Sequence, residues 1–337
     1  MTYSAIIFKN DKIGDIIHSF LAIKKIINNS EDKKVLIYLS NLNSEIKFLF
    51  NYPNVEFKVV SEKLSLIEKI NIIIFFLFNK VNETYIFKPS NFLFFLPFIF
   101  YFKKLKFNGI CINKAKYYRP SKFFRNFLNR YEVNDRGTKK IRKSIMNLYL
   151  DLIENRKDNN KLLSYDFKFK NNVINDLPND YILFHYNKLK FDYLGWNIDD
   201  LNSILKNLNL IEKKIILTND LNDINTNNIL DEKYKDSNVI YLPNIKGKDF
   251  FDVIGNSKLV IALHGMITAI GAIQNIKVLD LFYCNIKNVN DFYKYKNSFH
   301  EFKPKKDNYE FIIPKKNINK TIIKINHIIN HGRKINY

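Results

Sequence analysis

Short apolar runs alternate with segments of helical periodicity along most of the chain, and this alternation restricts the fold more than any other feature. Thr2–Lys9 is rich in β-branched and aromatic residues, and the segment after it carries apolar side chains at helical spacing from Ile16 to Ile27. A continuous run rich in β-branched and aromatic residues is typical of a strand covered on both faces. Strands that alternate with helices predict βαβ units and a mainly parallel, doubly wound sheet.

The alternation continues through both halves of the chain. Further strands are expected at Val35–Leu39, Val55–Val60, Thr84–Lys88, Leu105–Ile112, Tyr181–His185, Lys214–Thr218, Asn238–Leu242, Lys258–Leu263 and Lys277–Phe282. Helices are expected at Lys63–Phe78, Thr138–Ile153 and Asn317–Ile329. The very polar segment Glu154–Lys161 separates the two series and predicts a domain boundary.

We therefore expect an α/β protein of two Rossmann-like, doubly wound domains that face each other across a cleft. The chain of 337 residues is long enough for two domains of about 150 residues each. The expected segments are residues 1–160, residues 161–315 and a C-terminal helix in residues 316–337. Open α/β sheets bind ligands at the carboxyl ends of their strands, so functional residues are expected in the loops that follow strands.

The charge of the chain leaves two interpretations open. Lys and Arg number 54 against 33 Asp and Glu, which gives a formal net charge of +21. A basic surface could bind nucleic acid, membrane phosphate or a nucleotide-activated substrate. Alternatively, the excess is compositional, because the chain is rich in Lys, Asn, Ile, Phe and Tyr throughout. No recognisable nucleic-acid-binding module is present and the basic residues are dispersed, so we expect no nucleic-acid partner.

Several classes of protein lose support from what the sequence lacks. Two cysteines, Cys111 and Cys284, form no disulfide framework, and the six histidines show no metal-ligand spacing, so we expect a reducing compartment and no metal. There is no Walker loop, no GxGxxG and no Asp-x-Asp pair. No segment has the ~18–20 uninterrupted apolar residues of a spanning helix, and the N-terminal sequence does not resemble a signal peptide. A cytoplasmic location is therefore expected.

The aromatic run Phe92–Phe102 also has two interpretations. It is too short to span a membrane, so it is either a helix in the core of the first domain or a segment inserted partly into a membrane surface. In the second case Lys103, Lys104 and Lys106 would lie near anionic head groups.

The first candidate site follows the first strand, in the sequence KNDKIGDIIHSF. Gly14 would permit a tight turn and Asp15 would open the helix, with His18 one turn later. From residue types alone, Asp15 is either a helix N-cap or a general base at the carboxyl edge of the sheet. His18 is either a structural imidazole or part of the site.

The second and third candidates lie in the second half of the chain. Free amides at the start of the helix that follows His264 and Gly265, at about Met266, would form an anion site, and Thr268 could add a hydroxyl donor. The alternative is an ordinary strand-to-helix turn. Directly after another strand, Lys188 and Lys190 could neutralise phosphate on the same rim, or be two more lysines of a lysine-rich chain, and Trp196 is expected to be a packing residue.

These segments together resemble glycosyltransferase family 9, the lipopolysaccharide heptosyltransferases. Lys9–Phe20 is similar to the family's N-terminal Gly-Asp signature, and Lys246–Phe282 is similar to its donor-domain ending. The resemblance implies a GT-B fold, with an acceptor-binding first domain and a nucleotide-sugar-binding second domain. It implies inverting transfer from a nucleotide-diphosphate sugar, usually ADP-heptose, to a lipid-anchored glycan at the inner face of the cytoplasmic membrane, without a metal or other cofactor.

By the same resemblance, Asp15 is the general base, with Gly14 and His18 on the acceptor side. Lys188, Lys190, His264, Gly265, Met266 and Thr268 are then the donor-binding residues. This sequence departs from the family in the donor motif, where Leu263-His264-Gly265 replaces Asp-Thr/Ser-Gly. A relative that binds nucleotide sugar or glycolipid without turnover is therefore the alternative function.

Overall fold

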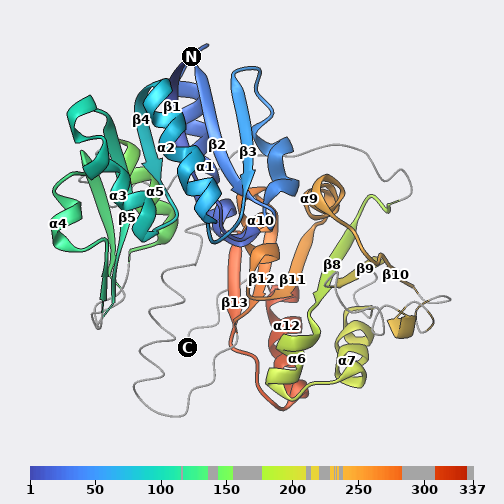
Figure 1. Ribbon diagram of the computed structural model, residues 1–337. Coiled ribbons are helices and arrows are strands. Elements are labelled where there is room, and N and C mark those ends of the chain that lie inside the picture. The colour runs from blue at the N-terminus through green and yellow to red at the C-terminus, as the bar shows by residue number, and fades with distance from the viewer. Residues whose placement is uncertain are drawn as a thin grey trace. The chain divides into compact units, whose positions relative to one another are not determined.

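The computed structural model describes residues 1–114, 117–135, 143–154, 177–209, 214–219, 228–230, 232, 234, 238–282 and 308–331 (Figure 1). These residues form two compact units, one from β1 to α5 and the other from β8 to α12. Of the domain boundary expected at Glu154–Lys161, residues 155–161 lie outside the described residues. The first residues of the helix expected at Thr138–Ile153, 138–142, also lie outside them.

The first unit is built on a parallel sheet with strand order β3-β2-β1-β4-β5. At one edge, β6 pairs antiparallel with β5, and β7 continues the parallel arrangement on β5. The strands are β1 (Thr2–Phe8), β2 (Lys34–Ser40), β3 (Val55–Val60), β4 (Lys80–Ile86), β5 (Lys106–Lys114), β6 (Tyr117–Arg119) and β7 (Arg130–Asp135). β1 pairs with β2 on one side and with β4 on the other, so the strand order changes direction at β1. In folds of this kind, ligands bind at the carboxyl edge of the sheet beside such a change of direction.

Helices cover both faces of this sheet. They are α1 (Ile13–Asn29), η1 (Ser44–Phe50), α2 (Leu66–Phe78), α3 (Asn91–Ile99), η2 (Tyr101–Lys103), α4 (Lys122–Arg125) and α5 (Ile145–Glu154). α1 and α5 pack together, whereas α2 and α3 share one apolar core with alternate residues of β1 and β2. α2 starts at a capping box, in which Ser65 and Glu68 satisfy each other's backbone amides.

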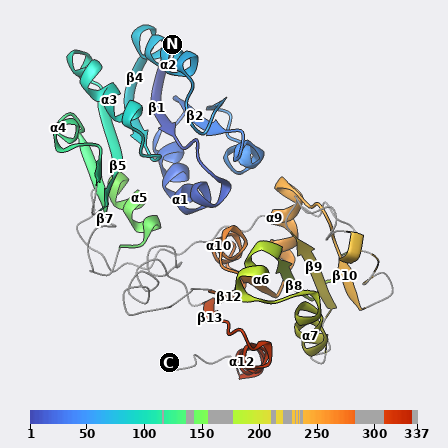
Figure 2. The same ribbon diagram turned by 60° about the horizontal axis from the view of Figure 1, so that its bottom comes forward.

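The second unit repeats this architecture with a parallel sheet of order β10-β9-β8-β11-β12-β13, the Rossmann order. Its strands are β8 (Tyr181–Tyr186), β9 (Lys214–Asn219), β10 (Val239–Tyr241), β11 (Leu259–Leu263), β12 (Lys277–Leu281) and β13 (Tyr309–Ile312). Its helices are α6 (Lys188–Leu194), α7 (Ile198–Asn209), α9 (Gly247–Asn256), α10 (Met266–Ile273) and α12 (Ile318–His331), as Figure 2 shows. Trp196 is buried in this core, as predicted.

The expected fold class, two doubly wound parallel sheets, is confirmed, and three edge strands, β6, β7 and β13, were missed. β7 and β13 are only partly buried and carry polar residues, so neither produces a continuous apolar run. Edge strands gain their place from pairing with a neighbour, β5 or β12, which a local pattern does not report.

The aromatic run expected at Phe92–Phe102 divides between core and surface. Phe94 and Phe100 are buried, whereas Phe98 and Phe102 are exposed. Within the described residues, no helix combines the length and the apolar character that a membrane crossing requires.

Candidate functional site

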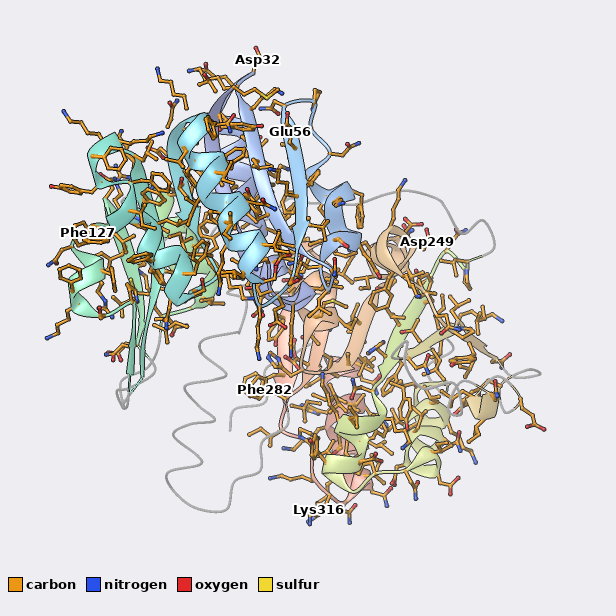
Figure 3. All side chains as sticks on the ribbon, in the orientation of Figure 1. Asp32, Glu56, Phe127, Asp249, Phe282 and Lys316 are labelled. Carbon is orange, nitrogen blue, oxygen red and sulfur yellow. The ribbon has the colours of Figure 1, made fainter. Side chains whose placement is uncertain are left out.

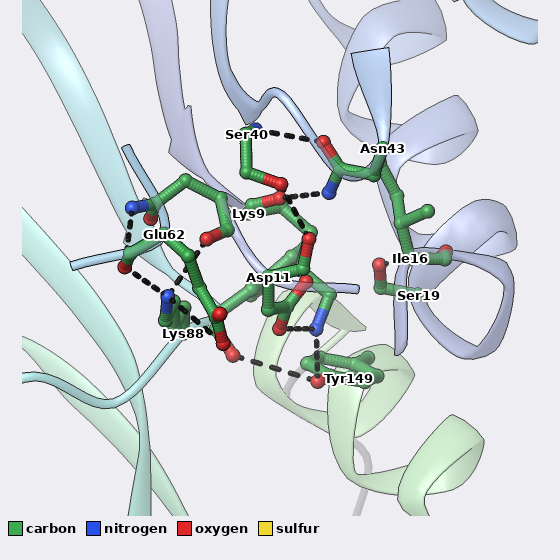
Figure 4. A network of polar contacts seen from close by, with 11 residues as sticks. Lys9, Asp11, Ile16, Ser19, Ser40, Asn43, Glu62, Lys88 and Tyr149 are labelled. Atoms are coloured by element: carbon green, nitrogen blue, oxygen red, sulfur yellow. Dashed lines mark hydrogen bonds and ion pairs between the residues drawn. The ribbon is translucent and has the colours of Figure 1, made fainter. Parts of the chain in front are cut away.

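The carboxyl end of β1 in the first unit leads into a buried polar network (Figure 4). The Lys9 ammonium lies 2.7 Å from the Asp11 carboxylate and donates to the Tyr149 hydroxyl at 2.9 Å. Only 1% of the Lys9 side chain and 13% of the Asp11 side chain are exposed. A buried charge requires a partner, and here α5 supplies Tyr149 to complete the environment of the ion pair.

The protonation of this network is set by burial and by neighbouring charge. Burial by itself lowers the pKa of Lys9, but the charges of Asp11, Tyr149 and Asp15 raise it, and the net direction is upward. Burial raises the pKa of Asp11, against the lowering effect of Lys9. The neighbouring negative charges therefore favour the charged form of Lys9 in spite of its burial.

A second lysine joins the same edge from the segment after β4. Lys88 donates to the backbone oxygen of Asn10 at 2.7 Å and also to that of Glu62. The Asn10 side chain in turn donates to the backbone oxygen of Ser61 at 3.0 Å. These hydrogen bonds join the loops that follow β1, β3 and β4. They therefore stabilise the carboxyl edge of the sheet, from which α1 and Asp15 follow in the chain.

Asp15 lies in the first turn of α1, directly beyond this network. The helix begins at Ile13 with Lys12 as its N-cap, so the interpretation of Asp15 as the N-cap is wrong. Gly14 is inside the first helical turn and is not among the residues with positive φ, so the tight turn expected there is also wrong. His18 follows one turn later and is half-buried.

In the second unit, a buried carboxylate holds the histidine of the β11–α10 turn. His264 Nδ1 lies 2.6 Å from Asp280 Oδ2, and the Tyr309 hydroxyl donates to the same oxygen. Asp280 is fully buried on β12, whereas 26% of the His264 side chain is exposed. Because Nδ1 is engaged by the carboxylate, the orientation of the His264 ring is fixed.

Lys190 places a positive charge on the same turn. Its ammonium donates to the backbone oxygen of His264 at 2.6 Å and to that of Leu263 at 3.3 Å. α6 is positioned for this by the Asn187 side chain, which accepts from the Lys190 amide at 2.9 Å. A Cβ atom on Gly265 would lie 2.9 Å from the Lys190 ammonium, so glycine leaves the space that the ammonium occupies.

The remaining predicted donor residues occupy different environments. Met266 is the first residue of α10, as expected, and the buried Thr268 hydroxyl donates to the Gly265 backbone oxygen at 2.9 Å. Thr268 therefore closes the turn. Lys188 lies on exposed α6 surface with its ammonium 3.6 Å from the Asp192 carboxylate. The turn thus brings together Lys190, His264 and the first amides of α10, an arrangement that suits an anion.

The sequence interpretation missed four residues that complete these two sites. They are Lys9, Asp11 and Tyr149 in the first unit and Asp280 in the second. Asp280 had a sequence signal, since it is a charged residue in the middle of the apolar strand KVLDL. Tyr149 had none, because its role depends on how α5 packs. Among the described residues, no group of three His, Cys, Asp or Glu side chains is arranged to hold a metal ion.

Two Rossmann-like parallel sheets in one chain, each with polar side chains at its carboxyl edge, define the GT-B fold. No protein-family model matches the sequence, and no curated protein matches it either. The chain is similar to solved structures instead, and the sequence identities to them are so low that the similarity shows the fold alone.

Three solved structures illustrate this similarity. The E. coli heptosyltransferase WaaC with ADP-2-deoxy-2-fluoro heptose matches with a TM-score of 0.61 and 12% identity, over 97% of this chain and 100% of that chain. A glycosyl transferase family 9 protein from Veillonella parvula matches at 0.62 and 12%, over 96% and 91%. UDP-GlcNAc 2-epimerase from Methanocaldococcus jannaschii matches at 0.57 and 14%, over 99% and 94%. The chain therefore has the fold of the family 9 heptosyltransferases, which nucleotide-sugar epimerases share.

Proposed function

We propose that this chain is an inverting glycosyltransferase. It moves a heptose or related sugar from a nucleotide-diphosphate sugar to a lipopolysaccharide-core or other surface glycan at the inner face of the cytoplasmic membrane. The observation that carries the proposal is the β11–α10 turn, where Lys190, His264 and the first amides of α10 gather around Gly265. The fold shared with WaaC, which binds an ADP-heptose analogue, supports the substrate class.

The donor diphosphate binds at this turn in the proposed reaction. The Lys190 ammonium and the positive end of α10 neutralise the charge that develops on the leaving phosphate. His264, held by Asp280, lies at the same turn and forms part of the wall of the donor site. In the alignment with the family's Asp-Thr/Ser-Gly motif, His264 stands at the position of the hydroxyl residue and Leu263 at that of the carboxylate, so this chain lacks the family's carboxylate there.

Asp15 acts as the general base in the same reaction. Its carboxylate accepts the proton of the acceptor hydroxyl, and the hydroxyl oxygen forms a bond to the anomeric carbon of the sugar. The bond from that carbon to the donor phosphate breaks, and the nucleoside diphosphate leaves with the electron pair. Attack from the side opposite the leaving group inverts the anomeric centre. No metal is required if Lys190 and α10 carry the charge of the leaving group.

An assay with a panel of nucleotide sugars and glycan acceptors tests this proposal. Mass spectrometry should show two products, the acceptor carrying one added sugar and the free nucleoside diphosphate. Both should form with and without EDTA. An epimerised nucleotide sugar without acceptor modification, identified by NMR because epimers have the same mass, would support the second candidate, a 2-epimerase, which the likeness to epimerases of the same fold favours. Tight nucleotide binding with neither product would indicate the non-catalytic relative and contradict the transferase proposal.

Lys190→Met is expected to weaken donor binding by about 10- to 100-fold, because a charge-assisted hydrogen bond contributes about 1.5–3 kcal/mol. Isothermal titration with ADP, UDP and GDP sugars measures this. Lys188→Met is the matched control, since Lys188 lies on the same helix and pairs with Asp192. Equal losses for both variants would remove Lys190 from the donor site.

Gly265→Ala is expected to weaken binding of the same ligands without unfolding the protein. The added Cβ would meet the Lys190 ammonium at 2.9 Å and displace it from the His264 and Leu263 oxygens. The thermal shift produced by nucleotide should fall, while the melting temperature without ligand changes little. An unchanged ligand shift would mean that the ammonium position is irrelevant to binding.

A further inference from the structure

The outer surface of α2 and α3 carries large apolar side chains that face solvent. On α2 they are Leu66, Ile67, Ile70, Ile74, Leu77 and Phe78, with exposed fractions from 45 to 79%. On α3 and η2 they are Phe95, Phe98, Tyr101 and Phe102, from 39 to 70% exposed. We refer to these ten side chains as the apolar face. Exposed apolar residues in such a group mark an interaction surface, whereas single ones need no explanation.

The apolar face is one surface because α2 and α3 lie against each other on the same side of the sheet. The rings of Phe76 on α2 and Phe100 after α3 have centroids 5.5 Å apart, and both belong to one core. The face continues toward α4, where the Phe127 ring lies 5.2 Å from that of Phe98 (Figure 3). A stripe along the 13 residues of α2 is about 20 Å long, at 1.5 Å per residue.

The charge around the apolar face is predominantly positive. From residue 84 to residue 131 the sequence contains no Asp or Glu but ten Lys and Arg. Within α2 and α3 the one acidic side chain is Glu68, and its oxygens accept from the Ser61 and Ser65 amides in the helix cap. A surface of this composition is complementary to a dense array of negative charge.

A basic cavity lies at the amino edge of the sheet, where its lining runs from the ends of α1 and α5 to the lysines that follow Phe102. It has a volume of about 680 Å³, and its cationic lining consists of Lys80, Lys103, Lys104, Lys106 and Arg130. Its one acidic residue, Glu83, lies 3.9 Å from the Lys106 ammonium. Lys103 connects cavity and face, because it directly follows Phe102 and donates to the Leu77 backbone oxygen at 2.7 Å.

We propose that the apolar face and the basic cavity together dock the first unit onto an anionic lipid bilayer. The apolar side chains enter the boundary between head groups and acyl chains, and the cavity takes lipid phosphate. A helix with an apolar outer face and flanking lysines binds in the plane of such a boundary, about 5–10 Å deep. The proposal deepens the proposed function by naming the surface on which a membrane-anchored acceptor is reached, and it rests on that function only for the acceptor.

Sedimentation with sugar-free vesicles tests the docking. The full chain should bind vesicles of phosphatidylglycerol and phosphatidylcholine, bind pure phosphatidylcholine at least tenfold more weakly, and be released by salt. Tyr101→Ser with Phe102→Ser should weaken binding by at least tenfold. Lys104→Asn with Lys106→Gln should weaken it about fivefold for each lysine. Asn suits position 104 because its φ is 53°.

Matched controls come from the second unit. Ile229→Ser with Ile323→Ser removes two exposed apolar side chains, and Lys206→Gln with Lys320→Gln removes two exposed lysines. Both control pairs should bind vesicles like the unmodified chain. All variants should keep the circular dichroism, melting temperature and nucleotide binding of the unmodified chain, because every replaced side chain is largely in solvent.

Two outcomes would overturn the docking proposal. One is absence of vesicle binding, or equal losses for the face variants and the controls. The other is a lipid-free dimer, seen by light scattering, that Tyr101→Ser with Phe102→Ser dissociates, since the face would then be covered by a second copy. Neither outcome would contradict the proposed sugar transfer, because the transfer assay with a water-soluble acceptor contains no lipid. Loss of transfer with normal vesicle binding would contradict the proposed function alone.

Discussion

Replacing Asp15 with Asn is expected to lower the rate of sugar transfer by about 10²- to 10⁴-fold, the usual contribution of a general base. The amide keeps the size of the side chain but has no basic oxygen for the acceptor proton. Donor affinity should stay the same, because Lys190 and His264, which form the proposed donor site, belong to the other unit. Single-turnover rates and donor titrations on the same samples separate these two effects.

The control for Asp15→Asn is Asp199→Asn. Asp199 lies in the first turn of α7, as Asp15 does in α1, so both changes remove a carboxylate that is favourable near a helix N-terminus. That loss is about 0.3–1 kcal/mol of stability and should not alter the rate. If the two variants transfer sugar equally well, Asp15 is not the base.

Lys9→Met is expected to lower the free energy of unfolding by about 3–5 kcal/mol, the cost of leaving a buried charge without its partner. The ammonium is almost completely buried, and its removal strands Asp11, whose second oxygen, Oδ1, already has no hydrogen-bond partner among the described residues. Urea denaturation followed by circular dichroism measures the change. A loss below about 1 kcal/mol would show that the network is not a structural element of the first unit.

A surface ion pair in the same sheet provides the control. Lys34 and Glu56 pair on β2 and β3 with side chains 45% and 41% exposed, so Lys34→Met should cost less than about 1 kcal/mol. In a double-mutant cycle, Lys9→Met with Asp11→Asn should lose less stability than the sum of the single changes, because no unpaired full charge remains. Additive losses would contradict a direct interaction between the two side chains.

The fold was predictable because its signal is repeated and local. The runs Ala5–Phe8 and Leu259–Leu263, within the expected strands Thr2–Lys9 and Lys258–Leu263, are apolar without interruption, as is typical of buried parallel strands, and the structure has strands at both places. β7 was not predicted, since an edge strand with a polar sequence is defined by its partner β5. The aromatic run around Pro97 was ambiguous for a related reason. Apolar side chains lie on both the buried face and the exposed face of α3, so the sequence pattern did not show which face belongs to the core.

In the two candidate sites, too, some residues were predictable from the sequence and others were not. Asp15 and the β11–α10 turn could be found from sequence, because each is a short segment directly after a strand. The Lys9–Tyr149 bond joins residues 140 positions apart, and the His264–Asp280 pair joins the β11–α10 turn to the strand β12. Contacts of this kind depend on which strands pair and which helix packs behind them.

The sequence by itself thus determined the alternation of strands and helices, the positions of the two candidate loops and the excess of positive charge. The tertiary structure alone decided which charges are buried and paired, as with Lys9 and Asp11, and which gather on a surface, as with Lys103 and Lys104. The physical reason is that burial and pairing are properties of three-dimensional neighbourhoods. A lysine has the same local sequence signal whether it closes an ion pair in the core or faces solvent beside an apolar surface.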